Sequence, residues 1–219
     1  MVKNKFIAVF VVAALVPVVL LFKCFGNLHD AAPVLPAGHI AVPAISQETD
    51  FSCGAASLLS VLRYWGVFSG SEADLYKPLD TTTEGTSAGR MSAFAGSLGL
   101  ESETKKDMTI AGLRTALAEG RTVILSIQAW VKKKPRPPWS DIWDDGHYVV
   151  LVAIDEHYIY LMDPALSDAY GYLPLDEFVE RWHDYADASY EREYHFGILI
   201  RGKTANNFAL PAGKLERVE

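Results

Sequence analysis

The chain has 219 residues, of which 50% are hydrophobic and 21% charged, so it has the length and composition of one ordinary globular domain or of two small ones. This composition excludes a disordered, collagen-like or coiled-coil chain. A formal charge of −7 argues against a general nucleic-acid-binding protein, and two cysteines supply neither a disulfide framework nor a structural zinc site.

The first segment has the pattern of a membrane element. Lys3 and Lys5 precede an unbroken apolar run over residues 6–22, and Lys23 follows it. As a helix this run spans about 25 Å, close to the ~30 Å of a hydrocarbon core. We therefore expect residues 1–25 to form a transmembrane anchor, with a cleaved signal peptide, and hence a secreted protein, as the alternative. Because the positive charge lies mainly before the run, the rest of the chain is expected outside the cytoplasm.

Three further regions follow the apolar run. Residues 26–45 carry three prolines among alanines and glycines, a composition typical of an extended tether. We expect a folded domain over residues 46–202 and a C-terminal tail over residues 203–219.

The predicted elements of the folded part place helices first and strands later. Leucines at helical spacing predict a helix that starts near Cys53 and ends at Gly66. The remaining elements are, in order, helices over Met91–Leu98 and Ile110–Glu119, strands over Thr122–Gln128, His147–Ile154 and Tyr158–Met162, a helix over Leu175–Asp184, and a strand over Phe196–Ile200. This order favours an α+β fold, in which N-terminal helices pack on an antiparallel sheet, over alternating βαβ units.

The segment from Gln47 to Leu58, QETDFSCGAASL, is the most informative for chemistry. It places Cys53 in the first turn of a predicted helix, where free backbone N–H groups and the helix dipole favour the thiolate. The N–H of Cys53 and the side-chain amide of Gln47 can both donate to an oxyanion. The alternative is a buried structural cysteine, which this segment alone does not exclude.

A thiolate nucleophile requires a base, and the base requires a group that orients it. If the hairpin after the strand that begins at His147 is centred on Asp155, His147 and Asp163 lie directly opposite each other, with Cβ atoms about 5 Å apart. A carboxylate at this distance fixes the tautomer of the imidazole and stabilises the imidazolium. The alternative is an exposed ion pair at the open end of a hairpin.

The other chemical signals are weaker. His195 is the second choice as base, because no carboxylate partner is evident for it. No metal-ligand spacing is present, so we expect neither a metal nor another cofactor. The segment Gly197–Thr204 has the spacing of a P-loop, but its intervening residues read as a strand and no helix follows, so we expect no nucleotide site. The basic and aromatic stretch Lys132–Trp143 is either a wall of the cleft, selecting acidic or aromatic groups, or a solvated loop.

Three motifs in order resemble a known family: Gln47 with CGAASL at residues 53–58, GHYVVL at residues 146–151, and Asp163-Pro164. They resemble the bacteriocin-processing, or double-glycine leader, peptidases, which are papain-like cysteine peptidases, and the similarity covers residues 40–202.

This resemblance implies that Cys53 is the nucleophile, His147 the general acid and base, Asp163 the orienting residue and Gln47 the oxyanion donor. The best-known members are cytoplasmic domains fused to an ABC exporter. This chain has no credible ATP site and is expected outside the cytoplasm, so cleavage after two glycines is not carried over.

The expected function is that of a membrane-tethered cysteine peptidase with a peptide or protein substrate and no nucleic-acid or nucleotide partner. Two alternatives remain. A papain-like transpeptidase or peptidoglycan amidase would use the same residues with another acceptor or substrate. A catalytically silent module would capture a peptide for an export machine, and the presence of all four site residues argues against it.

Overall fold

The structure, a computed structural model, describes residues 33–132, 134–186 and 190–219. The expected membrane anchor and the first part of the expected tether lie outside these residues. Within the described part of the chain, no helix has both the length and the apolar character that crossing a membrane requires.

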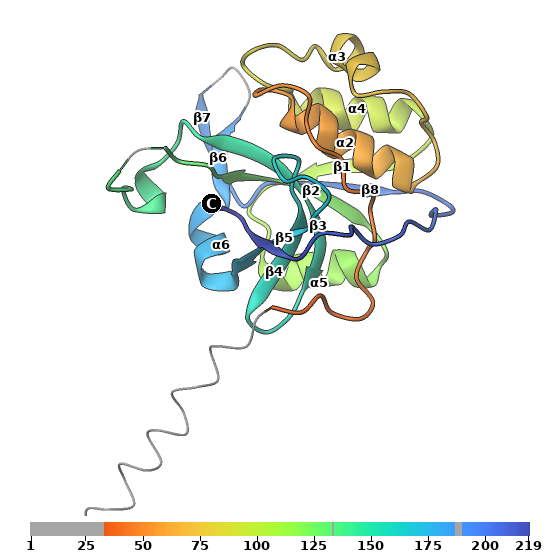
Figure 1. The fold of residues 1–219 in the computed structure, drawn as a ribbon. Helices are drawn as coiled ribbons and strands as arrows, with labels where there is room; N and C mark the ends of the chain where they lie inside the picture. The colour runs from red at the N-terminus through yellow and green to blue at the C-terminus, as the bar shows by residue number, and fades with distance from the viewer. Residues whose placement is uncertain (1–32, 133, 187–189) are drawn as a thin grey trace, which may run out of the picture. The chain divides into compact units, whose positions relative to one another are not determined.

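A seven-stranded sheet, with strand order β1-β8-β2-β3-β4-β5-β9, forms the centre of the domain (Figure 1). Its neighbouring strands pair antiparallel, except that β9 is parallel to β5. The strands are β1 (Glu101–Lys105), β2 (Thr122–Gln128), β3 (Gly146–Ile154), β4 (Tyr158–Met162), β5 (Gly171–Pro174), β8 (Gly197–Arg201) and β9 (Glu216–Arg217).

Helices cover both faces of this sheet, which explains why β2 is buried along its whole length. On one face pack α2 (Cys53–Tyr64), α3 (Ala73–Leu79) and α4 (Ala88–Ser97), and on the other α5 (Ile110–Ala118) and α6 (Leu175–Arg181). Alternate residues of a strand point to opposite faces, so Val150 and Val152 join the first core, whereas Val149 and Leu151 join the second. The prediction of an α+β fold with a largely antiparallel sheet is confirmed.

Small residues at the start of α2 allow this helix to approach the sheet closely. A Cβ atom on Gly54 would lie 2.8 Å from Thr86 and 3.1 Å from Tyr148. The Ser57 hydroxyl donates to the carbonyl of Tyr148 at 3.0 Å. The N-terminus of α2 is therefore held against the beginning of β3, which is where His147 lies.

Most predicted elements are present, but the helix predicted over Leu175–Asp184 is wrong at its end. The helix stops at Arg181, and the chain enters β6 (His183–Ala186), which pairs with β7 (Glu191–Tyr194) in a separate two-stranded sheet. Between the two, Trp182 adopts a non-helical conformation and is almost fully buried. Burial of this indole ends the helix earlier than the polar pattern of the sequence indicates.

The register predicted for the β3–β4 hairpin is also wrong. The prediction pairs Val150 with Tyr160, whereas Val150 lies opposite Met162 in the structure. The turn is longer than expected, and a β-bulge between Leu151 and Ala153 shifts the pairing again. His147 and Asp163 are therefore not a directly opposed pair.

Parts of the expected tether and tail belong to the folded domain. Ile40 and Val42 are buried in the first core, and the N–H of Ile40 donates to the carbonyl of Val152, the bulged residue of β3. At the other end of the chain, Val218 is fully buried beside β5. The prolines and small residues around these positions concealed the few apolar side chains that anchor both segments.

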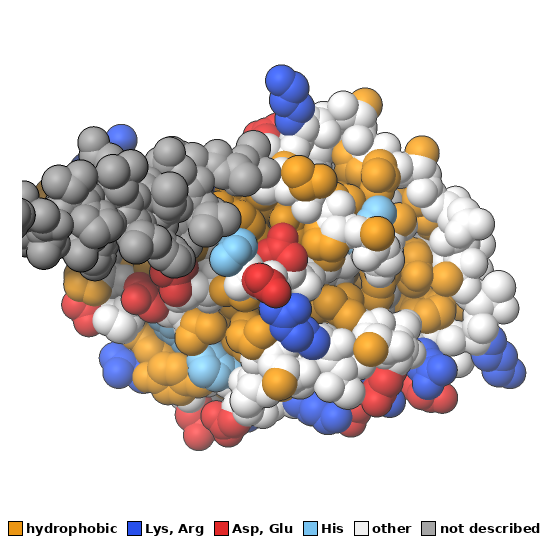
Figure 2. Space-filling model, turned by 90° about the horizontal axis from the view of Figure 1, so that it is seen from below, with side chains coloured by type: hydrophobic (Ala, Val, Ile, Leu, Met, Phe, Trp, Pro, Cys, Tyr) orange, Lys and Arg blue, Asp and Glu red, His pale blue; other side chains and the backbone are white. Residues whose placement is uncertain are grey.

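On the face shown in Figure 2, acidic and basic side chains are interspersed among apolar ones. That face offers no continuous basic surface of the kind that binds nucleic acid.

We predict that residues 34–45 contribute to stability as part of the domain. A chain that begins at residue 46 loses the buried side chains of Ile40 and Val42, which should lower the free energy of unfolding by about 3–5 kcal/mol relative to a chain that begins at residue 34. Urea denaturation of both chains measures the difference. Equal midpoints and equal slopes would contradict the assignment of these residues to the core.

Candidate active site

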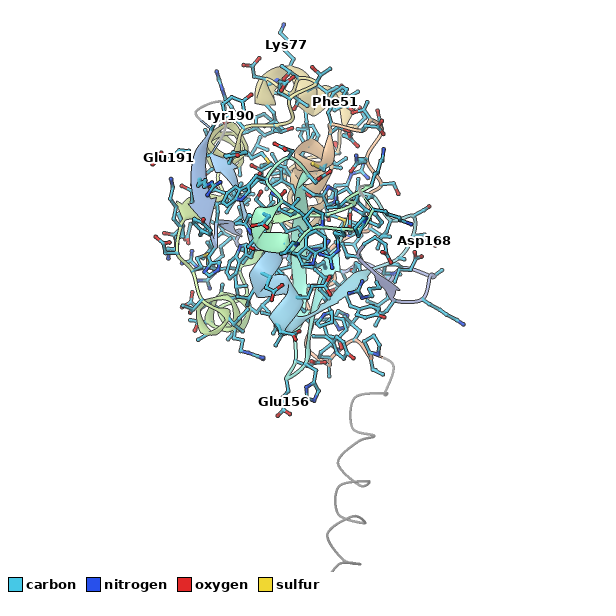
Figure 3. All side chains as sticks on the ribbon, turned by 90° about the vertical axis from the view of Figure 1, so that its left-hand side faces the viewer. Phe51, Lys77, Glu156, Asp168, Tyr190 and Glu191 are labelled. Atoms are coloured by element: carbon cyan, nitrogen blue, oxygen red, sulfur yellow. The ribbon has the colours of Figure 1, made fainter. Side chains whose placement is uncertain are left out.

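The candidate site forms where α2, the start of β3 and the residue after β4 meet. Cys53 is the first residue of α2, His147 the second residue of β3, and Asp163 follows β4 directly. Figure 3 places Phe51, just before α2, far from Glu156 at the tip of the β3–β4 hairpin. The site therefore lies at the open end of this hairpin.

His147 and Asp163 form a buried hydrogen-bonded pair. Nε2 of His147 lies 2.7 Å from Oδ1 of Asp163, and the two residues are only 6% and 1% exposed. The same carboxylate oxygen accepts the backbone N–H of Ala165 at 2.8 Å. The pair predicted from the hairpin thus forms in spite of the altered register. Its burial excludes the alternative of an exposed ion pair.

The environment of His147 favours its protonated form. Burial alone would lower its pKa, but the charge and hydrogen bond of Asp163 outweigh burial, and the Cys53 thiol adds a smaller effect of the same sign. Together these interactions raise the pKa of His147 to about 10. Since Nε2 is engaged by Asp163, Nδ1 is the nitrogen left to face Cys53. The arrangement can hold a thiolate beside an imidazolium at neutral pH.

The N-terminal turn of α2 adds a second source of stabilisation for a thiolate. Ser52 occupies the N-cap position, but its hydroxyl bonds the N–H and C=O of Thr49 and does not cap the helix. The first turn of α2 therefore has no side-chain cap, and it begins with Cys53, which is a free, half-buried cysteine.

Gln47 is tied to both sides of the site. Its backbone N–H donates to the carbonyl of Pro164, next to Asp163, at 2.9 Å. Its side-chain amide donates to the carbonyl of Thr49 at 2.7 Å. An amide nitrogen carries two hydrogens, so one donor remains for a substrate oxygen. The structure thus places Gln47 in the same loop that leads into Cys53.

A polar cluster behind His147 was not predicted. Asp184 of β6 accepts the Ser126 hydroxyl at 2.5 Å and the Gln128 amide at 3.3 Å, and burial raises the pKa of its carboxyl group. A Cβ atom on Gly146 would clash with this carboxylate, so the glycine before His147 is needed for the close approach. The sequence held a weak signal for this cluster, because Ser126 and Gln128 are polar residues at the end of a largely apolar strand.

The remaining sequence candidates lie elsewhere. The ring of His195, the second choice as base, stacks on Trp182 of the second core, with 4.8 Å between the ring centroids. Gly197–Arg201 forms β8 inside the sheet, as the strand interpretation of the P-loop spacing requires. Within the described residues, no group of three or more His, Cys, Asp or Glu side chains is arranged to hold a metal ion.

The stretch Lys132–Trp143 has two different halves. Lys132 and Lys134 are exposed, as expected for a solvated loop. Trp139 is buried between the guanidinium groups of Arg136 and Arg181, which lie 4.1 and 4.0 Å from its ring centroid. The aromatic half is thus anchored to the domain by cation–π contacts.

Comparisons with known proteins show the family and the fold to which this chain is similar. The family model described as Peptidase_C39 like family matches residues 39–190. A curated protein named "Probable functional amyloid protease FapD", from Pseudomonas fluorescens, is 26% identical over 151 residues, which are 64% of this chain and 56% of that protein. The chain therefore spans little more than half of that relative.

Two solved structures share the fold. A C39-like peptidase from Bacillus anthracis has a TM-score of 0.55 at 18% identity, covering 76% of this chain and 97% of its own. A double glycine motif protease from an AMS/PCAT transporter, in complex with the leader peptide, has a TM-score of 0.52 at 20% identity, covering 77% and 97%.

We predict that Asp163→Asn moves the alkaline limit of activity to lower pH. In the wild type, His147 should keep its proton until the pH approaches about 10, so the alkaline limb of kcat/KM for peptide hydrolysis should lie near that value. Without the carboxylate, burial of the imidazole lowers the pKa instead, and the limb should fall by at least about one pH unit. An unchanged limb in the variant would contradict the assigned role of Asp163.

The same proton links the site to stability. The folded protein binds it more tightly than the unfolded chain, where the pKa of histidine is about 6.5. The contribution of the His147–Asp163 pair is therefore complete below about pH 6.5 and is lost as the pH rises to about 10. In Asp163→Asn, the free energy of unfolding should no longer decline between pH 6.5 and about 10. Urea denaturation of the wild type and the variant over this pH range measures the difference.

Proposed function

Because the chain belongs to the Peptidase_C39 like family of cysteine peptidases, we propose that it hydrolyses a peptide bond through nucleophilic attack by Cys53. The observation that supports this mechanism best is the buried His147–Asp163 hydrogen bond, with the Cys53 thiol on the other side of the imidazole. These groups supply the nucleophile, the proton carrier and the orienting carboxylate that an acyl-transfer reaction needs.

In the proposed first step, the Cys53 thiolate attacks the carbonyl carbon of the peptide bond. The negative charge that develops on the carbonyl oxygen is stabilised by the backbone N–H of Cys53 and the free N–H of the Gln47 amide. The C–N bond then breaks, the leaving amine takes the proton of His147, and a thioester remains on Cys53.

In the second step, neutral His147 accepts a proton from a water molecule, and the resulting hydroxide attacks the thioester carbonyl. The tetrahedral intermediate releases the carboxylic acid product and the thiolate, beside an imidazolium that again carries its proton. Asp163 remains ionised in both steps and keeps the ring of His147 oriented.

The proposed substrate is a polypeptide, and the proposal does not specify the sequence at which it is cleaved. One structural neighbour is in complex with the leader peptide, and one relative is named "Probable functional amyloid protease FapD", which supports a polypeptide substrate for this chain. Processing of a leader peptide is the first activity to test. Cleavage after two glycines is not part of the proposal, and sequencing the products formed from a peptide library would test it.

We predict that Cys53→Ala and His147→Ala abolish hydrolysis of a susceptible peptide, because each removes a group that takes part in bond breaking. Gln47→Ala should lower kcat by about 10²–10³ with a small change in KM, as for other oxyanion donors. His195→Ala is the matched control for His147 and should keep activity. Full activity in Cys53→Ala would exclude the proposed mechanism.

Two further readouts separate the alternatives. Mass spectrometry of the products, with and without an added amine, distinguishes hydrolysis from transpeptidation. Alkylation of Cys53 at pH about 6, where an ordinary thiol is mostly protonated, distinguishes an enzyme from a silent binding module.

We also propose that the chain is held in a membrane by residues 1–25, with the catalytic domain outside the cytoplasm. The support is the sequence pattern alone: lysines before an apolar run of the length of a membrane helix. The full chain should stay with membranes after carbonate extraction, and a chain without residues 1–26 should be released. Release of both chains by carbonate would exclude the anchor.

A further inference from the structure

Glu72 is a buried acidic residue to which neither the sequence motifs nor the comparisons assign a role. It lies directly before α3 and is only 2% exposed. Both carboxylate oxygens lie close to the backbone nitrogen of Glu48, at 3.3 and 3.2 Å, and one of them also accepts the Tyr76 hydroxyl at 2.8 Å. Within the described residues, the ion pairs include none with Glu72.

This contact matters because of the peptide unit that Glu72 holds. The N–H of Glu48 belongs to the peptide bond that joins Gln47 to Glu48. The preceding peptide unit is held as well, since the N–H of Gln47 donates to the carbonyl of Pro164. Glu72 and Pro164 therefore fix the backbone on both sides of Gln47, and with it the direction in which the side chain leaves the chain.

The rest of the loop leads from this clamp to the nucleophile. The Thr49 carbonyl accepts both the Gln47 amide and the Ser52 hydroxyl. The Ser52 hydroxyl also accepts the N–H of Thr49, and Ser52 directly precedes Cys53. The loop is thus cross-linked within itself, and Glu72 attaches it to α3.

The burial of Glu72 has an energetic cost. A carboxylate removed from water without a cation loses hydration that two or three neutral hydrogen bonds replace only in part. Packing α3 onto the domain would not require such a group, because an apolar side chain would serve this purpose better. The presence of a carboxyl group at this position is therefore explained by the backbone N–H of Glu48, which it accepts.

We propose that Glu72 is a positioning residue for the oxyanion hole: it fixes the peptide unit after Gln47, so that the amide of Gln47 is already in place when charge develops on the substrate oxygen. This inference rests on the proposed function, because it assigns Gln47 as the oxyanion donor. It extends the site to the residue directly before α3, 25 positions from Gln47 in the sequence.

The test begins with three substitutions of Glu72. Glu72→Ala removes the acceptor, and kcat for peptide hydrolysis should fall about 10- to 50-fold, with a change in KM below about threefold. Glu72→Gln keeps a side-chain oxygen for the N–H of Glu48 and should stay within about threefold of the wild type. Glu72→Asp keeps the charge but withdraws the acceptor, so it should resemble Glu72→Ala, and it replaces that variant if Glu72→Ala does not fold.

Lys77→Ala is the matched control. Lys77 lies on the same helix and projects into solvent (Figure 3), so its removal should leave kcat unchanged. A loss of activity in this variant equal to that of Glu72→Ala would show that α3 tolerates no substitution, and would contradict a specific role for Glu72.

A double-mutant cycle separates positioning from general stability. In a Gln47→Ala background, adding Glu72→Ala should change kcat by less than about twofold, because the group that Glu72 positions is already absent. The rate of Cys53 alkylation by iodoacetamide should stay within about twofold of the wild type in Glu72→Ala. Multiplicative losses of kcat, or a parallel loss of alkylation, would overturn the inference.

The outcome for Glu72 can be distinguished from the outcome for the proposed function. If hydrolysis is lost in Cys53→Ala but Glu72→Ala keeps the wild-type kcat, only the role of Glu72 is wrong. If hydrolysis persists in Cys53→Ala, the proposed function itself is wrong, and the role of Glu72 falls with it.

Discussion

The hydrogen bond between His147 and Asp163 is the interaction on which the candidate site depends. It joins the beginning of β3 to the residue after β4, and both partners are buried. In such surroundings an unpaired carboxylate or imidazolium would be costly, whereas the pair stabilises both charges. The raised pKa of His147 follows mainly from this pairing, and Cys53 lies beside that imidazole in the first turn of a helix without a side-chain cap.

The pair belongs to a sheet that helices cover on both faces, and both His147 and Asp163 are buried there. Backbone contacts then connect the other members of the site to the pair. The backbone N–H of Gln47 donates a hydrogen bond to the carbonyl of the residue after Asp163, and the same loop continues into Cys53. The residues proposed as oxyanion donor, orienting carboxylate and nucleophile are therefore held by one connected set of contacts, to which Glu72 adds an attachment next to α3.

Local patterns in the sequence were sufficient for much of this fold. Leucines at helical spacing predicted α2, long apolar runs predicted β2, β3, β4 and β8, and the predicted resemblance to a family of cysteine peptidases is confirmed by the family match. The polar edge strand β1 carries no such pattern, and a longer turn together with a bulge changed the register of the hairpin. The contacts of Glu72 and Asp184 join distant segments, so local patterns do not identify the partners of these two carboxyl groups. His147 still reaches Asp163, because the side chains of residues that lie two positions out of direct register can remain in contact.

The most direct test of this account is a ¹⁵N NMR titration of the imidazole of His147 in the wild-type protein. The account predicts that both ring nitrogens carry a proton at pH 8 and that the ring titrates near pH 10. A neutral imidazole at pH 8, with a titration near the ordinary value of about 6.5, would show that Asp163 does not hold the proton on His147 and would contradict the central claim.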